Sequence, residues 1–231
     1  MQQWGVKRAG RAFFSTDPTT LARELIGATL HRRLEDGGVA SGVIVETEAY
    51  LGALDRCCHS FGNRRTAKNN SMFLLPGTAY LYFTYGMHHC FNVVCGTIAD
   101  PEEPVAVLVR ALLPASGTDG MFERRGPGAK RLHDLCSGPG KLCRALSLDL
   151  SLDGQDMTKS LDLWITPGRE RKTRLVRSSR IGVSGGKGSG TAKSEREKWV
   201  GARLRWYDPD AAAWVSVRAK PEQIERWKPR E

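Results

Sequence analysis

The sequence predicts a protein of the α+β class, built on a mostly antiparallel sheet with helices around it. Residues 39–50 are rich in β-branched side chains, and Asp36-Gly37 before them is a turn that joins antiparallel strands, so residues 30–34 are expected to be the partner strand. A second pair of strand-like segments surrounds Gly86. A helix-start signal, Asp17-Pro18, precedes the first pair. The 231 residues allow one domain or two, with a sizeable core.

Local signals define each element in turn. Residues 1–12 are basic and mixed in character, which predicts a flexible arm. From Asp17 the first helix continues to Ile26, and Gly27 can end it. Residues 105–112 form an uninterrupted apolar strand that ends near Arg110. Further helices are expected at 121–125, 131–135, 142–148 and 221–227, further strands at 161–165, 204–207 and 214–217, and a mobile Gly/Ser-rich loop at about 184–196.

Composition and charge restrict the class of protein. Hydrophobic residues make up 40% of the chain and charged residues 26%, as in ordinary soluble proteins. No apolar run reaches the length of about 18 residues that a membrane span needs, and the N-terminus lacks an apolar signal region, so we expect an intracellular protein. The formal net charge of +10 predicts either a polyanionic partner or a solvated basic surface.

The cysteines and histidines do not predict a metal site. The chain has six cysteines, and none has the C-x-x-C spacing of structural zinc sites. His88, His89, Cys90 and Cys95 could ligate a metal together, but adjacent residues of a strand point to opposite faces. We therefore expect no metal and reduced, partly buried cysteines.

A strand with two carboxylates is the first candidate for chemistry. If side chains alternate regularly, Ile44, Glu46, Glu48 and Tyr50 share one face, and Val43 lies with its odd-numbered neighbours on the other. Two carboxylates and a phenol on one face are out of place in a pure core and suit a general base. The alternation alone does not choose between the two glutamates.

Aromatic residues surround the second candidate, the turn at Gly86. Tyr80 and Tyr82 share one strand face, and Tyr80 is expected to pack in the sheet. Tyr85 and Met87 flank the turn. A large aromatic side chain and a methionine at a tip suit insertion into something apolar and stacked, such as a base step, although a plain surface aromatic is the alternative.

Together these stretches resemble the alkyladenine (3-methyladenine) DNA glycosylase family. The order and spacing of several long motifs match over residues 13–217. These motifs are Val-Glu-Thr-Glu-Ala-Tyr-Leu-Gly at 45–52, His59-Ser60, Met72-Phe73 with Pro76-Gly77-Thr78, Tyr85-Gly86-Met87 and Cys136-Ser137-Gly138-Pro139.

The resemblance implies a fold and an activity. The expected fold is a single catalytic domain of residues 13–231, with a curved, mostly antiparallel sheet and a protruding hairpin that inserts into DNA. Members of the family flip alkylated or deaminated purines, such as 3-methyladenine, 7-methylguanine, hypoxanthine and ethenoadenine, out of duplex DNA. They hydrolyse the N-glycosidic bond without a metal or other cofactor and leave an abasic site, with no lyase activity. The implied partner is double-stranded DNA with damaged purines, bound by a monomer in a nucleus or in a bacterial cytoplasm and nucleoid.

The resemblance also assigns roles to residues. Glu48 corresponds to the general base that activates water, and Arg110 to a residue that holds the flipped nucleotide and the water. Tyr50 and His59 correspond to one wall of the base pocket and Tyr82 to the other. The remaining correspondences are Asn92 as the group that excludes the guanine amino group, Tyr85 with Met87 as the intercalating pair, and Arg65, Thr66, Met72, Lys141, Arg180 and Gly182 as contacts to the DNA backbone.

Two other functions fit parts of the same pattern. A non-catalytic binder of lesions or single strands would keep the pocket and bind in a salt-dependent manner without releasing a base. A metal-dependent nuclease would use Glu46, Glu48 and the histidines, and EDTA would stop its strand cleavage. A base-release assay distinguishes all three.

Overall fold

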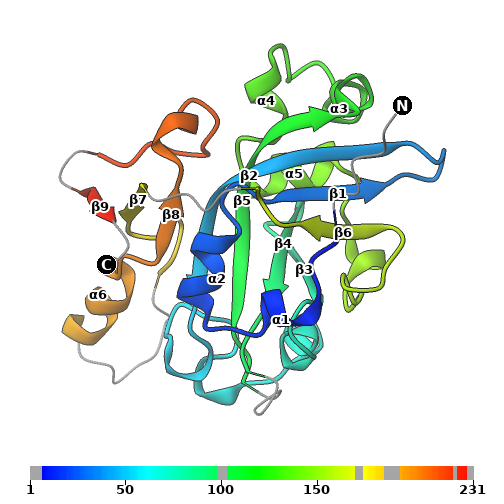
Figure 1. Cartoon of the computed structure of the whole chain (residues 1–231). Helices are drawn as coiled ribbons and strands as arrows, with labels where there is room; N and C mark the ends of the chain where they lie inside the picture. The colour runs from blue at the N-terminus through cyan, green and yellow to red at the C-terminus, as the bar shows by residue number, and fades with distance from the viewer. Residues whose placement is uncertain (1–6, 98–102, 170–173, 185–192, 221–222, 228–231) are drawn as a thin grey trace.

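The computed structural model describes residues 7–97, 103–169, 174–184, 193–220 and 223–227, and its centre is the long strand β2 (Val39–Tyr50). β2 pairs with β1 (Thr29–Arg33), β5 (Ala106–Ser116) and β8 (Arg205–Tyr207), in each case antiparallel. The sheet is strongly curled and runs in the order β3-β4-β5-β2-β8-β7-β9, with β1 and β6 extending from β2 (Figure 1). The predicted α+β class and curved antiparallel sheet are confirmed.

The remaining elements surround this sheet. The other strands are β3 (Ala79–Thr84), β4 (His88–Val94), β6 (Leu163–Thr166), β7 (Leu175–Ser178) and β9 (Glu225–Trp227). The helices are α1 (Arg11–Phe14), α2 (Pro18–Glu24), α3 (Thr118–Arg125), α4 (Leu132–Cys136), α5 (Pro139–Ala145) and α6 (Lys193–Gly201), with short 3-10 turns η1 (Gly52–Leu54), η2 (Phe61–Asn63), η3 (Ala67–Phe73), η4 (Leu150–Leu152) and η5 (Pro209–Ala211).

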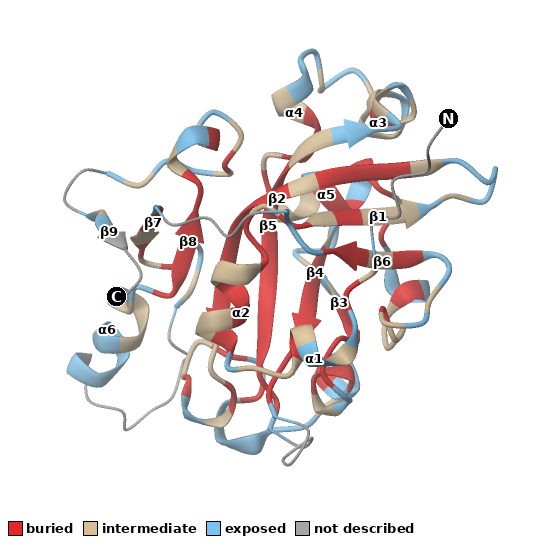
Figure 2. Ribbon diagram, viewed as in Figure 1, coloured by how far each residue is buried: buried red, intermediate tan, exposed pale blue. Residues whose placement is uncertain are grey.

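Helix α2 begins as its sequence predicts and covers one face of the sheet. The Asp17 carboxylate accepts the backbone N–H groups of Thr19 and Thr20, both at 3.0 Å, and satisfies donors that a helix start leaves free. Thr47 of β2 donates to the carbonyl of Ala22 at 2.8 Å. Figure 2 shows that the central strands are buried along most of their length beneath this layer, whereas the outer helix α6 is largely exposed.

Paired irregularities interrupt the contact between β2 and β5. Ile44 is opposite Leu112 and Glu46 is opposite Ala111, so Val45 is an extra residue on β2; the next step skips Arg110 on β5. Each extra residue bends its strand and re-aims side chains. Ile44 therefore packs in the main core, while Val45 packs with Ala111 on the other side. The predicted strict alternation, with Ile44 on the same face as the glutamates, is wrong here.

Several predicted elements differ in the structure. Residues 214–217 are turns and bends instead of a strand, because the backbone N–H of Ser216 binds the Glu46 carboxylate rather than a neighbouring strand. Residues 225–227 form β9 on β7 rather than part of a helix, since pairing with β7, a strand without a clear signal in the sequence, outweighs the local helix preference.

The two segments expected to be flexible lie partly outside the described residues. Of the predicted arm of residues 1–12, residues 1–6 lie outside them, whereas Ala9 is buried and its N–H binds the carbonyl of Ile165. In the predicted loop at 184–196, residues 185–192 lie outside the described residues, and the last four residues belong to helix α6, which begins at Lys193.

Glu46 joins three strands and is expected to stabilise the fold. Its carboxylate binds Arg205 Nε at 2.6 Å, Arg110 Nε at 3.0 Å and the Ser216 backbone N–H at 2.6 Å, and it is completely buried. Glu46→Gln leaves the buried Arg205 without its carboxylate partner and Arg110 with Glu48 alone, so we expect the free energy of unfolding to fall by about 3–5 kcal/mol. Urea denaturation measures this change. The exposed control Glu35→Gln should stay within about 0.5 kcal/mol of the wild type, and equal losses would contradict the prediction.

Candidate active site

A cavity of about 490 Å³ lies on the face of the sheet opposite α2, to which Glu48 and Tyr50 point. Its volume is within the range of about 300–1,000 Å³ that is usual for small-molecule sites. Strands β2, β3, β4 and β5 contribute to it, together with the loop before η2 and the segment after β7. Eight of the predicted site residues line it: Tyr50, His59, Met72, Tyr82, Tyr85, Asn92, Arg110 and Gly182.

The carboxylate of Glu48 lies directly behind the wall of this cavity. Its Oε1 accepts the backbone N–H of Ile181 at 2.7 Å, and its Oε2 accepts the Tyr50 hydroxyl at 3.0 Å. The same Oε1 lies 3.1 Å from Arg110 Nη1 in an ion pair. Glu48 is completely buried, whereas all three of these partners line the cavity. Charge-assisted hydrogen bonds of this kind fix the orientation of a carboxylate, so Glu48 faces the cavity across a single layer of groups.

The two glutamates have different surroundings. Neither glutamate lines the cavity itself, but all three partners of Glu48 do, whereas of the Glu46 partners Arg110, Arg205 and Ser216 only Arg110 does. Arg110 connects the two carboxylates, since its Nε binds Glu46 and its Nη1 binds Glu48. Burial opposes the charge on Arg110, but the Glu48 and Glu46 carboxylates raise its pKa, so it remains a cation. The surroundings favour Glu48 over Glu46 as the group that faces a substrate.

The phenols of the cavity remain protonated. Burial and then the Glu48 charge raise the pKa of Tyr50, and burial and then Cys90 raise that of Tyr82. The Tyr50 hydroxyl can therefore donate a hydrogen bond to Glu48 over the whole physiological pH range.

His59 lies at the exposed side of the cavity and contacts two tyrosines. Its Nδ1 is 2.8 Å from the Tyr80 hydroxyl, and its ring stands edge-on to Tyr82 with a centroid distance of 4.6 Å and an interplanar angle of 84°. Protein atoms around the ring displace solvent and lower the pKa of His59 to about 4, and the Lys68 ammonium adds to the effect. The imidazole is therefore neutral at pH 7.

The arrangement of the walls differs from the expected sandwich. His59 and Tyr82 were predicted to lie on opposite sides of a bound base. In the structure the two rings are in contact, so they form one corner of the cavity and leave no space for a base between them. Tyr50 is a separate ring of the lining, held by its bond to Glu48.

Two buried polar residues support this corner. Tyr80 is only 2% exposed, as expected of a packing residue, but its hydroxyl also binds His59, a role that the sequence did not indicate. Asn92 is 3% exposed, and its amide donates to the backbone carbonyl of Tyr80 at 3.0 Å. Both side chains are therefore fixed, and the position of Asn92 in the lining is fixed with them.

The tip of the β3–β4 hairpin projects into solvent beside the cavity. Tyr85 is 80% exposed and Met87 is 69% exposed. Tyr85 and Gly86 both have left-handed φ values, 51° and 66°, as in the tight turns that suit antiparallel hairpins. A tyrosine in this conformation costs about 1–2 kcal/mol. A strained and exposed aromatic residue does not stabilise the fold, so it suggests a role in function.

The residues predicted to contact the DNA backbone fall into two groups. Arg65, Lys141 and Gly182 are exposed and Thr66 is partly exposed, so these four are accessible and their role stays a prediction. The other two, Met72 and Arg180, are buried.

The burial of Met72 and Arg180 contradicts their predicted contacts with the DNA backbone. Met72 packs with Cys58 and Tyr80 beneath the cavity, and the Arg180 side chain is completely buried in an ion pair with Asp55. Neither side chain reaches a surface where a phosphate could bind. A basic residue type predicts a solvated or DNA-facing position on average, but a buried partner such as Asp55 reverses that expectation.

Ile181 and Asp55 are parts of the site that the sequence analysis missed. Ile181 contributes a backbone N–H, which carries no signal in the side-chain pattern. Asp55 is separated from Arg180 by more than a hundred residues, and no local rule connects them.

The described part of the chain contains neither a membrane helix nor a metal cluster. None of its helices is long and apolar enough to cross a bilayer. No three His, Cys, Asp or Glu side chains among these residues are arranged to hold a metal ion. All six cysteines are free thiols, as predicted.

The comparison with known families agrees with this geometry. The model of the methylpurine-DNA glycosylase family matches residues 12–210, most of the chain. This chain belongs to the methylpurine-DNA glycosylase family. Mouse DNA-3-methyladenine glycosylase is 39% identical over 91% of this chain and 61% of its own length. The human DNA-3-methyladenine glycosylase is 38% identical over 91% of this chain and 68% of its own. A relative from Desulfitobacterium hafniense is 40% identical over 77% of this chain and 88% of its own.

The chain therefore covers these relatives to different extents. It spans about three fifths of the mouse protein and most of the bacterial one. The family match includes β2, the hairpin and the segment that carries Ile181, so every group that contacts Glu48 lies inside the matched residues.

A titration tests the state of His59 in this member of the family. Because its pKa is about 4, we expect the ring to stay neutral from pH 8 down to pH 5, as measured by NMR of the imidazole. The unfolded chain, with an ordinary His pKa of about 6.5, binds this proton first. The contribution of His59 to stability is therefore full above pH 6.5 and is lost as the pH falls toward 4. Burial also lowers the pKa of His31, so a His31→Gln variant is used to assign the NMR signal of that ring separately. A His59 midpoint near 6.5 would contradict the prediction.

Proposed function

We propose that this protein is a monofunctional DNA glycosylase of base excision repair. It flips an alkylated or deaminated purine out of duplex DNA and hydrolyses the N-glycosidic bond, leaving an abasic site. Its substrates are of the 3-methyladenine, 7-methylguanine, hypoxanthine and ethenoadenine class. The observation that carries the proposal is the Glu48 carboxylate, oriented by Arg110, Tyr50 and Ile181 toward a cavity lined with aromatic rings.

The surroundings of Glu48 suit activation of a water molecule. A general base must lie within hydrogen-bond reach of the proton it removes, directly or through one water. A water that enters beside Tyr50 reaches Glu48, and the Arg110 cation orients it. The sugar becomes oxocarbenium-like as the base departs, and a nearby carboxylate stabilises that positive charge. Glu48 can thus both activate the water and stabilise the positive charge on the sugar.

The cavity suits a flipped purine. Tyr50 and the corner formed by His59 and Tyr82 offer ring surfaces for a planar base, a contact worth about 1–3 kcal/mol for each base stacked. The neutral His59 avoids repelling a cationic lesion such as 3-methyladenine. Asn92 is immobilised by its bond to the Tyr80 carbonyl, and a fixed side chain excludes the extra amino group of guanine more sharply than a free one.

The exterior suits the DNA duplex. Tyr85 and Met87 stand beside the cavity, where they can fill the space that an extruded base leaves. The net charge of +10 and the exposed Arg65, Lys141, Thr66 and Gly182 provide contacts to phosphates. We expect the protein to act as a monomer, and a DNA substrate would be met in a nucleus or in a bacterial cytoplasm and nucleoid.

A base-release assay tests the proposal. Duplex DNA with a single hypoxanthine or ethenoadenine, incubated with the protein, should acquire an alkali-labile site without direct strand cleavage, and EDTA should not change the rate. Binding without base release would favour a lesion-binding protein. Strand cleavage that EDTA stops would favour a nuclease, and either result would overturn the proposal.

Glu48→Gln tests the role of the carboxylate. Glutamine keeps the size and the hydrogen-bonding oxygen but cannot take up a proton from water, so we expect a loss of at least about 10²-fold in single-turnover rate with retained lesion binding. Glu35→Gln, an exposed acid, is the matched control and should retain the full rate. Normal activity of Glu48→Gln would move the role of the base to another residue.

Tyr85→Asn separates stability from function at the hairpin tip. Asparagine tolerates a φ of 51° better than tyrosine does, so we expect the melting temperature to stay the same or rise. The variant lacks the ring that fills the duplex, so its excision rate from duplex DNA should fall more than its rate on a single strand. A large loss of stability, or unchanged excision from duplex DNA, would argue against the wedge role.

A further inference from the structure

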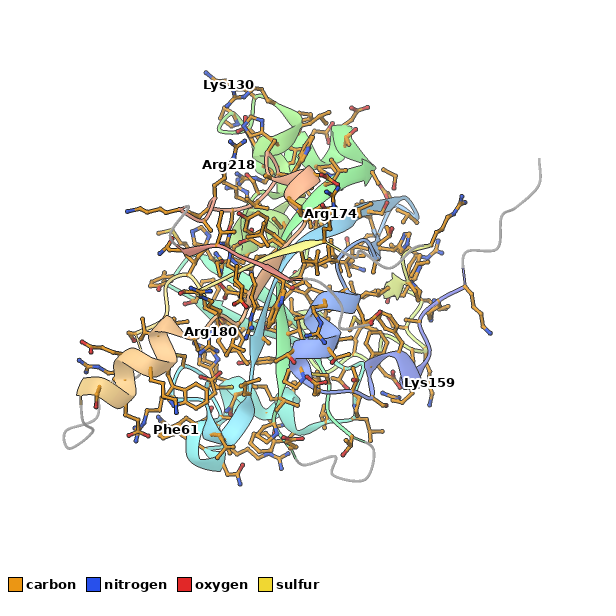
Figure 3. All side chains as sticks on the ribbon, turned by 60° about the vertical axis from the view of Figure 1, so that its left-hand side comes forward. Phe61, Lys130, Lys159, Arg174, Arg180 and Arg218 are labelled. Atoms are coloured by element: carbon orange, nitrogen blue, oxygen red, sulfur yellow. The ribbon has the colours of Figure 1, made fainter. Side chains whose placement is uncertain are left out.

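Two distant segments form neighbouring walls of the cavity, and a buried ion pair connects them. The loop that follows β2 carries the residues before His59, and the segment after β7 carries Ile181 and Gly182. Asp55 belongs to the first segment and Arg180 to the second. Figure 3 labels Arg180 on the side of the molecule where α6 approaches this loop.

Both side chains of the pair are completely buried. Arg180 Nη2 donates to Asp55 Oδ1 at 2.9 Å, and Arg180 Nη1 donates to Asp55 Oδ2. The Nε of Arg180 has no partner among the described residues. A buried charged pair adds little net stability compared with apolar packing, and an unpartnered donor adds a cost. Stability alone therefore does not account for this pair.

Asp55 holds the loop that leads to His59. Its Oδ2 accepts the backbone N–H of Leu51 at 3.1 Å, and its Oδ1 accepts that of Cys57 at 2.9 Å. These two bonds close the loop around the carboxylate. His59 follows only two residues after Cys57, so the start of its wall is fixed by Asp55.

Arg180 holds the end of β2 and the ring of Tyr50. Its Nη1 donates to the carbonyl of Ala49 at 3.1 Å, and its guanidinium carbon lies 4.7 Å from the centroid of the Tyr50 ring. Arg180 also donates to the carbonyl of Trp199 in α6 at 3.3 Å. The guanidinium thus fixes the strand end and the aromatic ring that come directly after Glu48.

The next residue completes the connection to the carboxylate. The backbone N–H of Ile181 donates to Glu48 Oε1 at 2.7 Å, and this bond forms only if the chain at Arg180 is in place. Of the three partners of Glu48, Tyr50 and Ile181 are therefore both held by Arg180, and Arg180 is held by Asp55.

We propose that Asp55 and Arg180 are positioning residues for the reaction, acting through Tyr50 and the Ile181 N–H on the Glu48 carboxylate. The inference rests on the proposed glycosylase function for its effect on rate, and on geometry alone for its effect on the Ile181 hydrogen bond. Arg180 is thus not a DNA contact but an internal support of the site.

The test compares Asp55→Asn and Arg180→Lys with a matched control, Asp156→Asn. Asp156 also pairs with an arginine, Arg11, and accepts a backbone N–H, that of Thr158 at 3.0 Å, but its side chain is partly exposed and its bonds do not reach the partners of Glu48. We measure the single-turnover excision rate, the affinity for duplex DNA with an uncleavable abasic analogue, the melting temperature, and the NMR shift of the Ile181 amide proton.

A displaced Tyr50 and Ile181 should slow the reaction without loosening DNA binding. Asp55→Asn is expected to lower the excision rate by about 10²-fold, the order of magnitude for a misplacement of about 1 Å. Its affinity for the abasic analogue should be unchanged, and the Ile181 amide proton should move upfield as its bond to the carboxylate lengthens. Arg180→Lys, which keeps the charge but loses the paired geometry, should lie between Asp55→Asn and the wild type.

Other results would overturn the inference. If Asp156→Asn slows excision as much as Asp55→Asn does, the effect is one of general stability. If both site variants keep the wild-type rate and the wild-type Ile181 shift, the pair does not position the site. Should Asp55→Asn fail to fold, Arg180→Lys provides the same two readouts. Should the wild type release no base, the proposed function fails, while the Ile181 shift still decides the inference.

Discussion

A carboxylate that has lost its water must receive hydrogen bonds from the protein, and the site depends on how Glu48 meets this requirement. Its partners come from three different parts of the chain: Tyr50 from the same strand and Ile181 from the segment after β7 donate hydrogen bonds, and Arg110 from β5 forms an ion pair. These partners line the cavity, so the demand for compensating groups places the carboxylate next to it. The same partners thus allow the Glu48 carboxylate to be buried and fix its orientation.

The irregular pairing of β2 with β5 makes this arrangement possible. The extra residue on β5 is Arg110, and the bend at this point aims its side chain across β2 at both glutamates. Glu46 joins β2 to Arg205 of β8, whereas the partners of Glu48 line the cavity. One arginine between two carboxylates keeps both charges compensated.

Stability alone explains neither the hairpin tip nor the Asp55–Arg180 pair. Tyr85 takes a backbone conformation that costs energy and exposes a large ring, features that make sense only with a partner. The buried pair instead connects two walls of the cavity through backbone carbonyls and amides. A rigid support behind the site and a strained tip in front of it together suit an enzyme that must distort its substrate while holding its own groups still.

The sequence by itself determined the elements that depend on neighbouring residues. The cap at Asp17, the bounds of β2, the hairpin at Gly86 and the exposed tip all follow from local chemistry, and the motif around Glu48 located the cavity. Only the tertiary structure decided the shift of Ile44 into the core, the pairing of β9, the burial of Arg180 and the contact of Glu48 with Ile181. Each of these depends on contacts between residues far apart in the chain, and a buried charge or backbone donor carries no local signal of the partner that satisfies it.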